Sequence, residues 1–533
     1  MMKNKIFLLL LISLTFCSCK KESNQTFELK EFTFYSSDLN EPLFFDDPIA
    51  QEISKRTGVT LKFYQNTSPN VGEDIDLMLA NNSYTDYIFA KSGINRLIEA
   101  GAVTPLDEYI EKYGNNIKKL YKNEIVKLRN TIEDPQIYTV GTYEIKSKVM
   151  ETSGNIQIQN AVLKEFGYPS IKTLDDLENI LKAYIKKYPE INGHKTQGLS
   201  LLTDSWYWYV CLSNPGNFVI GYPDDGQWIV NQDTMQATYK FLHPDMKIFY
   251  KWLNKIYYEG LLDPESFTQD ISLWKSKIEN GIVLSTASPD YLLTDSTKYL
   301  IQNYQESRTF AYLPVMANSN FKDQNLKDYG YSGGWGIAIS SSCKDKISAF
   351  KFLDWMCSEE AQILTNWGRE NIDYYYQDGV RKSFPNVDSS IGVGKWVYPF
   401  PQAGEGYLDS TGNPMAKVSR SEIIQNYTQT EIDTLNAYGV EIWADLFTQP
   451  ENLQVSKHGQ VWQYPLNPQL NDLINRVDEY VKKSLIKMIV GPQNSFDASW
   501  EEMKKNIISM GIKDVEEEIT NLIQMKIKLW SLD

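Results

Sequence analysis

The fold is decided by three short apolar runs near the N-terminus, Thr33-Phe34-Tyr35, Val59-Thr60-Leu61-Lys62-Phe63-Tyr64 and Tyr87-Ile88-Phe89-Ala90. They are rich in the β-branched and aromatic residues that favour strands. Helical patterns separate them at 49–57, which Gly58 ends, and at 74–81, and a third helical pattern at 94–100 ends at Gly101. This β-α-β-α-β order predicts a parallel sheet with crossover helices.

Further helices follow along the chain. Thr173 and Asp176 have the spacing of a capping box, and apolar residues then recur at helical intervals to position 185. Helices are also predicted at 246–258 and 344–356. Beyond Lys417 the pattern is mostly helical, with amphipathic segments at 470–489 and 500–508 that Gly491-Pro492 separates.

The composition limits the classes of function. A chain of 533 residues exceeds a single hydrophobic core and predicts two or three lobes. The net charge of −15 argues against nucleic acid as a partner, because neutralising phosphates needs a basic face that the sequence does not supply. The three histidines lie far apart without ligand spacing, and the few cysteines cannot form a disulfide scaffold. We therefore expect no metal and no cofactor.

The N-terminus is typical of an exported lipoprotein. Lys3 and Lys5 precede an apolar run at 6–16, which is too short to span a bilayer, and Ser18 then precedes Cys19. Residues 16–19 resemble a bacterial lipobox, which predicts a signal peptide at 1–18, lipidation of Cys19 and a tether at 19–30. Cys17 is the weaker acceptor because the bulky Phe16 precedes it. The alternative is an ordinary cleaved signal that leaves the mature protein free.

Aromatic residues are unusually abundant, with 13 Trp, 34 Tyr and 22 Phe. Several cluster beside Gly, Pro or Asp instead of following helix or strand periodicity, at 206–209, 334–336 and 396–401. Ring faces next to hydrogen-bonding groups suit sugars, because C–H groups stack on rings while hydroxyls need polar partners. The alternative for any single ring is ordinary core packing.

Five motifs in a shared order resemble the maltose-binding-like extracellular solute-binding proteins (family 1), and among them the LipO-like oligosaccharide-binding lipoproteins. One of them reads Tyr257-Tyr258-Glu259-Gly260-Leu261-Leu262-Asp263-Pro264-Glu265, and the others lie at 82–89, 97–107, 162–177 and 333–361. The resemblance implies an α/β, two-lobed periplasmic-binding-protein-like fold of type II, with a cleft between the lobes and a helical C-terminal region.

The same resemblance implies that each lobe is discontinuous. Lobe 1 is expected at 31–142 and 312–385, and lobe 2 at 143–311 and 386–533. The crossings are expected near 138–145, 311–314 and 376–394. The implied function is capture of a carbohydrate, expected to be an oligosaccharide, and its delivery to the permease subunits of an ABC transporter. We expect a monomer outside the cytoplasm, anchored to the membrane through Cys19, with no enzymatic activity.

Ligand-binding residues are expected at the carboxyl ends of parallel strands and on the loops that follow. The first-lobe candidates are Ser37, Tyr84, Asp86, Ser92 and Trp335. The second-lobe candidates are Trp206, Trp208, Asp290, Tyr291 and Trp396. Strand alternation would send Trp206 and Trp208 to the same face. For Trp335 the alternative is an interior ring packed on the following helix, and for Trp396 an exposed loop.

Some segments partly match motifs of other kinds of site. Residues 188–195 lack most of the aspartates of a calcium loop found in some relatives, so no metal is carried over. Residues 330–334 match G-x-S-x-G around Ser332, but a strand follows where a nucleophile elbow requires a helix. The alternatives that stay open are a secreted glycoside hydrolase or polysaccharide lyase, and a peptide-binding importer component.

Overall fold

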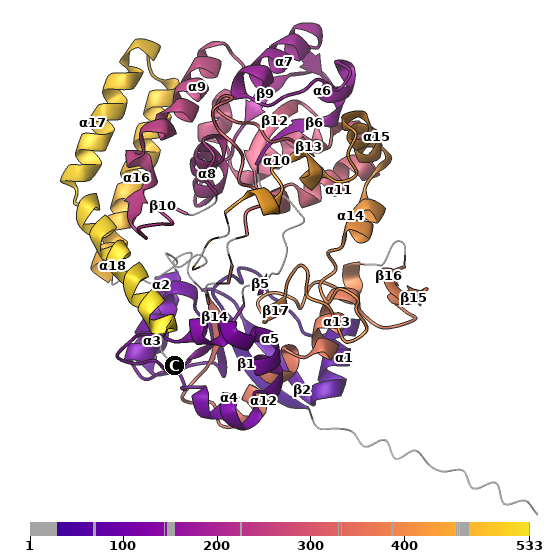
Figure 1. Ribbon diagram of the computed structural model, residues 1–533, viewed down its shortest axis with the longest axis vertical. Helices are drawn as coiled ribbons and strands as arrows, with labels where there is room; N and C mark the ends of the chain where they lie inside the picture. Colours follow the sequence, from indigo (N-terminus) through magenta and orange to yellow (C-terminus); the bar gives the residue numbers. More distant parts are fainter. Residues whose placement is uncertain are drawn as a thin grey trace, which may run out of the picture.

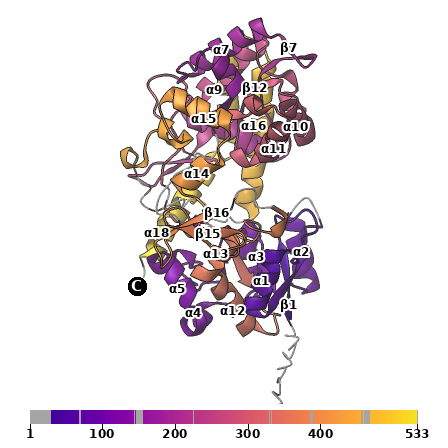
Figure 2. The ribbon, with the colours of Figure 1, turned by 90° about the vertical axis from the view of Figure 1, so that its right-hand side faces the viewer.

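The chain folds into two α/β lobes, which lie one above the other in Figure 1 and, seen from the side, in Figure 2. The computed structural model describes residues 29–67, 71–142, 144–145, 155–223, 226–328, 330–331, 333–384, 389–454, 456, 458 and 468–531. No helix in these ranges is both long enough and apolar enough to cross a membrane.

The first lobe is built on a five-stranded sheet in the order β2-β1-β3-β14-β4. Its strands are β1 (Lys30–Ser36), β2 (Val59–Tyr64), β3 (Tyr87–Phe89), β4 (Thr139–Gly141) and β14 (Gly336–Ile339). β1 pairs in parallel with β2 and with β3, whereas β14 is antiparallel to both β3 and β4. The carboxyl ends of β1, β3 and β4 therefore meet the amino end of β14 at one edge of the sheet.

The predicted β-α-β-α-β order of this lobe is confirmed. α1 (Pro48–Thr57), α2 (Val71–Asn81) and α3 (Ile94–Glu99) alternate with the three parallel strands. The Asp47 side chain caps the start of α1 by accepting from Ala50 N–H, and Gly58 ends the helix with φ 71°. A left-handed residue at this position is what glycine supplies at little cost. Other helices of this lobe are α4 (Asp107–Tyr113), α5 (Asn115–Tyr121), α12 (Lys346–Met356) and α13 (Glu359–Trp367).

The second lobe contains a four-stranded sheet in the order β13-β6-β12-β9. The strands are β6 (Asn155–Gln159), β9 (Gln197–Ser200), β12 (Val283–Ser288) and β13 (Phe310–Tyr312). β9 and β12 are parallel, while β6 is antiparallel to β12 and to β13. Helices α6 (Asn160–Glu165), α7 (Leu174–Lys187), α8 (Asn214–Val219), α9 (Lys247–Tyr258), α10 (Ile271–Glu279) and α11 (Thr294–Gln302) complete the lobe.

The start of α7 follows the sequence pattern closely. Thr173 accepts from Asp176 N–H, and the Asp176 carboxylate accepts from Thr173 N–H at 3.0 Å, which forms the predicted capping box. Apolar side chains of the helix, among them Leu174, Leu177 and Leu181, are buried in the core of the second lobe. The cap fixes where the helix begins, and the apolar face fixes how it packs.

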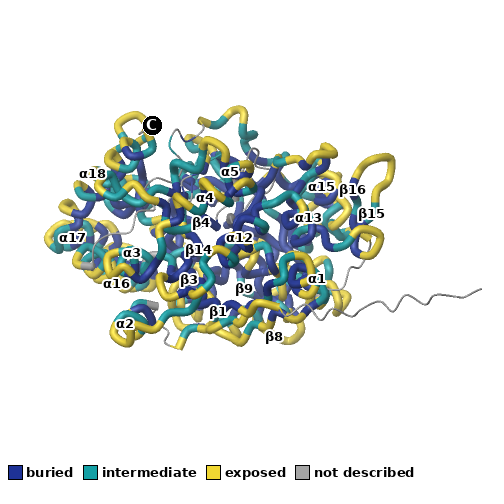
Figure 3. Tube along the Cα trace, turned by 90° about the horizontal axis from the view of Figure 1, so that it is seen from below, coloured by how far each residue is buried: buried dark blue, intermediate teal, exposed yellow. Residues whose placement is uncertain are grey.

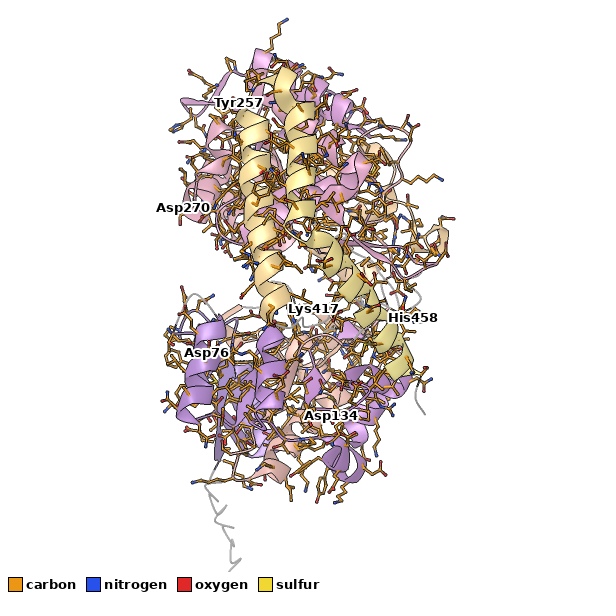
Figure 4. All side chains as sticks on the ribbon, turned by 90° about the vertical axis from the view of Figure 1, so that its left-hand side faces the viewer. Asp76, Asp134, Tyr257, Asp270, Lys417 and His458 are labelled. Atoms are coloured by element: carbon orange, nitrogen blue, oxygen red, sulfur yellow. The ribbon has the colours of Figure 1, made fainter. Side chains whose placement is uncertain are left out.

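The C-terminal region is helical, as predicted. It contains α14 (Arg420–Asn426), α15 (Gln429–Tyr438), α16 (Pro468–Val490), α17 (Phe496–Ser509) and α18 (Ile512–Trp530). α16 and α17 pack along the second lobe, and α18 runs from them to the first lobe (Figures 1 and 4). The last helix of the chain therefore reaches both lobes.

Short strands complete the described structure. Four pairs form: β5 (Glu144–Ile145) with β17 (Gln402–Ala403), β7 (Glu190–Ile191) with β8 (His194–Lys195), β10 (Trp228–Val230) with β11 (Ala237–Tyr239), and β15 (Tyr374–Gln377) with β16 (Val380–Ser383). Cys211, Cys343 and Cys357 are free and buried.

Each lobe has its own hydrophobic core, and the exposed residues lie toward the periphery (Figure 3). The core of the first lobe gathers side chains from β1, β2, β14 and α12. Trp396, Phe400 and Ala403 are buried in the same core. The expected range of lobe 2 from 386 onward therefore needs correction at its start, because these apolar side chains pack with β1 and β2 instead. The other expected lobe boundaries stay predictions.

Candidate functional site

Two crossing segments connect the sheets of the two lobes at corresponding edges. The chain leaves the first sheet at the carboxyl end of β4 and enters the second at the amino end of β6, beside the carboxyl end of β12. It returns from the carboxyl end of β13 to the amino end of β14. These are also the edges where the loops after parallel strands gather, which is where open α/β sheets bind ligands.

Trp335 lies at this edge of the first lobe, immediately before β14. Its backbone carbonyl accepts from Thr142 N–H at 2.8 Å, and its side chain is 36% exposed. The preceding Gly333 and Gly334 have φ of 86° and 66°, and a Cβ on Gly333 would lie 2.2 Å from the carbonyl oxygen of Lys127. Only glycine fits there, so the turn that presents Trp335 depends on it.

A charged side chain, that of Lys91, lies over the Trp335 ring. Lys91 follows β3, and its Nζ lies 4.3 Å from the centroid of the Trp335 ring. The same ammonium forms an ion pair with Asp38, which follows β1. Asp38 also accepts a hydrogen bond from the hydroxyl of Tyr398. Residues that are distant in sequence thus form one polar and aromatic surface on the first lobe.

Tyr398 was missed by the sequence analysis. Its ring is exposed and meets Phe89 edge-on, with centroids 5.7 Å apart. The signal lay in the aromatic stretch 396–401, where Trp396 was chosen as the ligand-binding residue instead. The sequence offers no means of telling which ring of such an irregular stretch faces outward.

Trp396 is buried and serves the fold. Its side chain is 1% exposed, packs against Phe45 and Phe63, and donates from Nε1 to both Asp47 oxygens at 3.0 and 2.9 Å. Because Asp47 also caps α1, Trp396 fixes a helix start. Both the expected ligand contact and its alternative, an exposed loop, are corrected by this burial.

Ser37 and Ser92 were expected at the first-lobe edge. Ser37 directly follows β1, is buried, and its hydroxyl has no hydrogen-bond partner among the described residues. Buried hydroxyls without a partner are costly, so we expect a water molecule or a bound ligand to complete the pairing of Ser37. Ser92 lies in the short 3-10 helix η1 (Lys91–Gly93) after β3, but its side chain lies outside the described structure.

Tyr84 and Asp86 lie at the opposite edge of the sheet. Both precede β3, whereas Lys91 follows it. The Asp86 carboxylate accepts from Thr33 N–H at 2.9 Å and from Thr33 Oγ1 at 2.7 Å, so it ties β3 to β1. Their expected place beside Ser37 is corrected, because a residue before a strand cannot lie at that strand's carboxyl end.

The second-lobe edge carries exposed rings after both of its parallel strands. Trp206 follows β9 and is 46% exposed, and Tyr291 follows β12 and is 56% exposed. Asp290 is exposed to solvent, yet burial within the surrounding protein raises the pKa of its carboxyl. Three expected residues thus lie at one edge.

Trp208 is a core residue. It is 2% exposed and lies beside Tyr209 and Phe241. Strand alternation does not apply to it, because residues after Trp206 enter a helix that continues as the π-helix η3 (Tyr209–Ser213). The expectation that both tryptophans share a face is therefore wrong, because the two residues do not lie on a strand.

Two further polar residues of the second lobe were missed. Asn217 in α8 is fully buried, and neither its amide nitrogen nor its amide oxygen has a hydrogen-bond partner among the described residues. α8 packs against β6, and the hydroxyl of Ser288, the last residue of β12, is likewise buried without such a partner. No local sequence signal marks either residue, since their state depends on tertiary burial.

Within the described residues, no group of three or more His, Cys, Asp and Glu side chains is placed to hold a metal ion. The segment 188–195 forms the β7–β8 hairpin, whose turn residues Asn192 and Gly193 have φ of 52° and 77°. Its local role is that of a tight hairpin turn.

Two α/β lobes joined by crossing segments, with exposed rings at the connected edges, define a two-lobed solute-binding protein. The chain belongs to the bacterial extracellular solute-binding protein family, whose profile matches residues 49–367. This membership places it outside the cytoplasm.

Relatives of the whole chain are found by sequence and by structure. "Lipoprotein LipO" of Bacillus subtilis is 23% identical over 488 residues, which cover 87% of this chain and 90% of the relative. "Fructooligosaccharide ABC transporter substrate-binding protein FusA" of Streptococcus pneumoniae is 23% identical over 535 residues, covering 92% and 90%. The solved structure of S. pneumoniae FusA in complex with kestose has a TM-score of 0.66 at 18% identity, covering 93% of this chain and 99% of that one. The similarity confirms the two-lobed fold.

Proposed function

We propose that this protein is a lipid-anchored, extracytoplasmic receptor that captures an oligosaccharide and delivers it to the permease subunits of an ABC transporter. The observation that carries the proposal is the set of exposed rings at the connected edges of the two lobes: Trp335 and Tyr398 on the first, Trp206 and Tyr291 on the second. The relative FusA supports the proposal, because its name describes a fructooligosaccharide ABC transporter substrate-binding protein.

The rings account for binding in physical terms. A ring face next to hydrogen-bonding groups binds the C–H face of a sugar, and each buried ring of this size contributes on the order of 1–3 kcal/mol. Polar groups for the hydroxyls lie near the rings: Asp38 accepts a hydrogen bond from Tyr398, and Asp290 directly precedes Tyr291 in the chain. Closure of the lobes would bring both sets onto one ligand.

The proposed anchor is a lipid on Cys19, a residue outside the described structure. A relative bearing the name lipoprotein supports it. A tether of about ten residues would keep the receptor near its transporter and raise its local concentration there. The lobe boundaries, the hinges and the expected monomeric state belong to the same proposal.

Binding without catalysis is part of the proposal. Members of this family are binding proteins, and the expected ring stacking needs no covalent step. A glycoside hydrolase would instead need two carboxyl groups placed on opposite sides of a scissile bond.

The deciding experiment uses the soluble chain starting at Lys20. Neutral and acidic oligosaccharides are titrated by calorimetry, and the sugars are then analysed by mass spectrometry. We expect micromolar or tighter binding with the sugars unchanged. Cleaved sugars would establish the hydrolase or lyase alternative, and binding of peptides without binding of sugars would establish the peptide importer.

A further inference from the structure

A cavity of about 310 Å³ is lined by Trp335 and other residues of the first lobe and by Lys526 of α18. Figure 1 shows the end of α18 beside the first lobe. Four of its lining residues are basic: Lys91, Lys127, Arg129 and Lys526. No acidic residue is among the described residues that line it. The contrast with the whole chain, whose net charge is −15, shows that the basic residues are concentrated locally. Clustered cations in a concave site focus the field on an anion.

Two of the four cations are held in place by groups outside the cavity. Lys91 pairs with Asp38 and lies over the Trp335 ring. Lys127 pairs with Glu124 at 2.6 Å and donates to the carbonyl of Tyr331 at 2.6 Å. These contacts fix the positions of both ammonium groups, so that they are preorganised toward the cavity.

The other two cations come from distant parts of the chain. Arg129 follows the 3-10 helix η2 (Lys122–Leu128) of the first lobe, whereas Lys526 lies on α18. Burial lowers the pKa of the Lys526 ammonium to about 8, so that the group is still mainly charged at pH 7. The nearby Asp134 does not line the cavity; it accepts hydrogen bonds from Tyr138 at 2.9 Å and Asn130 at 3.3 Å.

We propose that this cavity binds a negatively charged group of the captured solute, so that the ligand is an acidic saccharide with a carboxylate or a sulfate ester. The inference rests on the proposed function and narrows its substrate class. Trp335 would stack on the sugar ring while the cations receive its charge. Uronate and sulfate ester are two sources of the same anionic chemistry, and guanidinium and ammonium groups pair with either.

The cavity also links charge recognition to closure. Lys526 reaches the first lobe on the last helix, and Lys127 Nζ lies 5.2 Å from the ring centroid of Trp530 on the same helix. An anion between Lys526 and the lysines of the first lobe would attract both. An acidic ligand would therefore favour the arrangement in which α18 contacts the first lobe.

The test is a glycan array of neutral, uronate-bearing and sulfated oligosaccharides, probed with the chain starting at Lys20 and followed by calorimetry on each hit. We expect the hits to be acidic, and the uronate and sulfate arms to show which anion is preferred. Affinity should fall several-fold between 50 and 500 mM NaCl, because salt screens charge pairing. Inorganic sulfate at millimolar concentration should compete with the acidic hit.

The variant for this test is Lys526→Gln, and its matched control is Lys528→Gln, an exposed lysine of the same helix. Lys526→Gln should weaken binding of the acidic hit about tenfold, as expected for the loss of one charge-assisted pair. Lys528→Gln should bind as the wild type does.

The outcomes separate this inference from the proposed function. If only neutral oligosaccharides bind, or if Lys526→Gln binds an acidic hit as tightly as the wild type, the anionic assignment is overturned while saccharide capture stands. If no saccharide of any class binds, the proposed function itself fails.

Discussion

At the scale of single residues, Trp396 connects two parts of the first lobe. Its indole donates to Asp47, which also caps α1 and receives an ion pair from Lys395 at 3.0 Å. Hydrogen-bond donors replace the water that a carboxylate loses on burial. Removing one of these donors therefore destabilises the fold. Trp396 therefore contributes to stability, and its contribution can be separated from binding.

Trp396→Phe should lower the free energy of unfolding by about 1–3 kcal/mol, because the ring is retained while the hydrogen bond to Asp47 is lost. Chemical denaturation measures the change. Affinity for the solute should stay within twofold of the wild type. A large loss of affinity at unchanged stability would instead place Trp396 in the binding site.

Lys526 predicts a specific pH dependence of stability. Its folded pKa of about 8 lies below the value of 10.5 for a solvated lysine, so the unfolded chain binds more protons between these values. The wild type should therefore gain stability relative to Lys526→Gln as the pH rises from 8 to 10.5, and no such change is expected below pH 7. Unfolding of both proteins across this range provides the measurement. A difference independent of pH would contradict the burial of this ammonium.

At the scale of elements, the end of α16 depends on one side chain from α9. The buried Asn254 donates from Nδ2 toward the carbonyls of Met488, Ile489 and Gly491 at 3.0, 2.9 and 2.8 Å. These are carbonyls that a helix leaves without partners at its C-terminus. The contact therefore joins the C-terminal helices to the body of the second lobe.

Asn254→Ala should destabilise the protein by about 2–4 kcal/mol, since it leaves buried carbonyls unpaired and opens a small cavity. The control is Asn521→Ala on the exposed face of α18, which should change stability by less than about 0.5 kcal/mol. Equal unfolding midpoints for the two variants would show that Asn254 does not hold α16.

Elements with local signals could be predicted from the sequence, and the orientation of single rings could not. Thr173, Asp176 and Gly58 act through neighbours a few residues away, so their caps form as predicted. Trp206 and Trp208 differ in exposure because a helix starts between them, which no strand periodicity reveals. Tyr84 and Asp86 were expected at the edge that carries Ser37, but they lead into β3 and therefore lie at the opposite edge.

The site also combines residues that local sequence signals predict with residues that only tertiary packing brings together. Ser37, Asp290 and Tyr291 follow parallel strands, where the carboxyl-end rule expects them, whereas Trp335 reaches the same edge because it precedes the antiparallel strand β14. Tyr398, Asn217 and Lys526 come from an irregular stretch, a short helix and the last helix, and only tertiary packing brings them near those edges or into the cavity.

At the scale of the whole molecule, α18 directly contacts the first lobe. The Lys127 ammonium over the Trp530 ring is one of its interactions there. Any opening of the lobes that moves α18 with the second lobe must break this contact. The two lobes are therefore coupled by a contact as well as by crossing segments.

Trp530→Ala should shift the ligand-free protein toward more open arrangements, because a cation–π contact of about 0.5–2 kcal/mol is lost. Small-angle scattering should give a larger radius of gyration without ligand, and saturation should restore the wild-type value. Affinity should fall by the same factor as the population of the binding-competent state. Identical scattering curves without ligand would show that α18 does not restrain the lobes.

The central claim is that exposed rings at the connected edges bind the solute. It is tested most directly by calorimetric titration of the strongest oligosaccharide hit into Trp335→Ala, with Tyr304→Ala as the control. Tyr304 is 98% exposed and lies after α11, away from these edges. We predict that Trp335→Ala weakens binding by 10-fold to 100-fold, corresponding to about 1.4–2.8 kcal/mol of lost stacking, while Tyr304→Ala binds normally. Unchanged affinity in Trp335→Ala, with the fold intact by circular dichroism, would contradict the account.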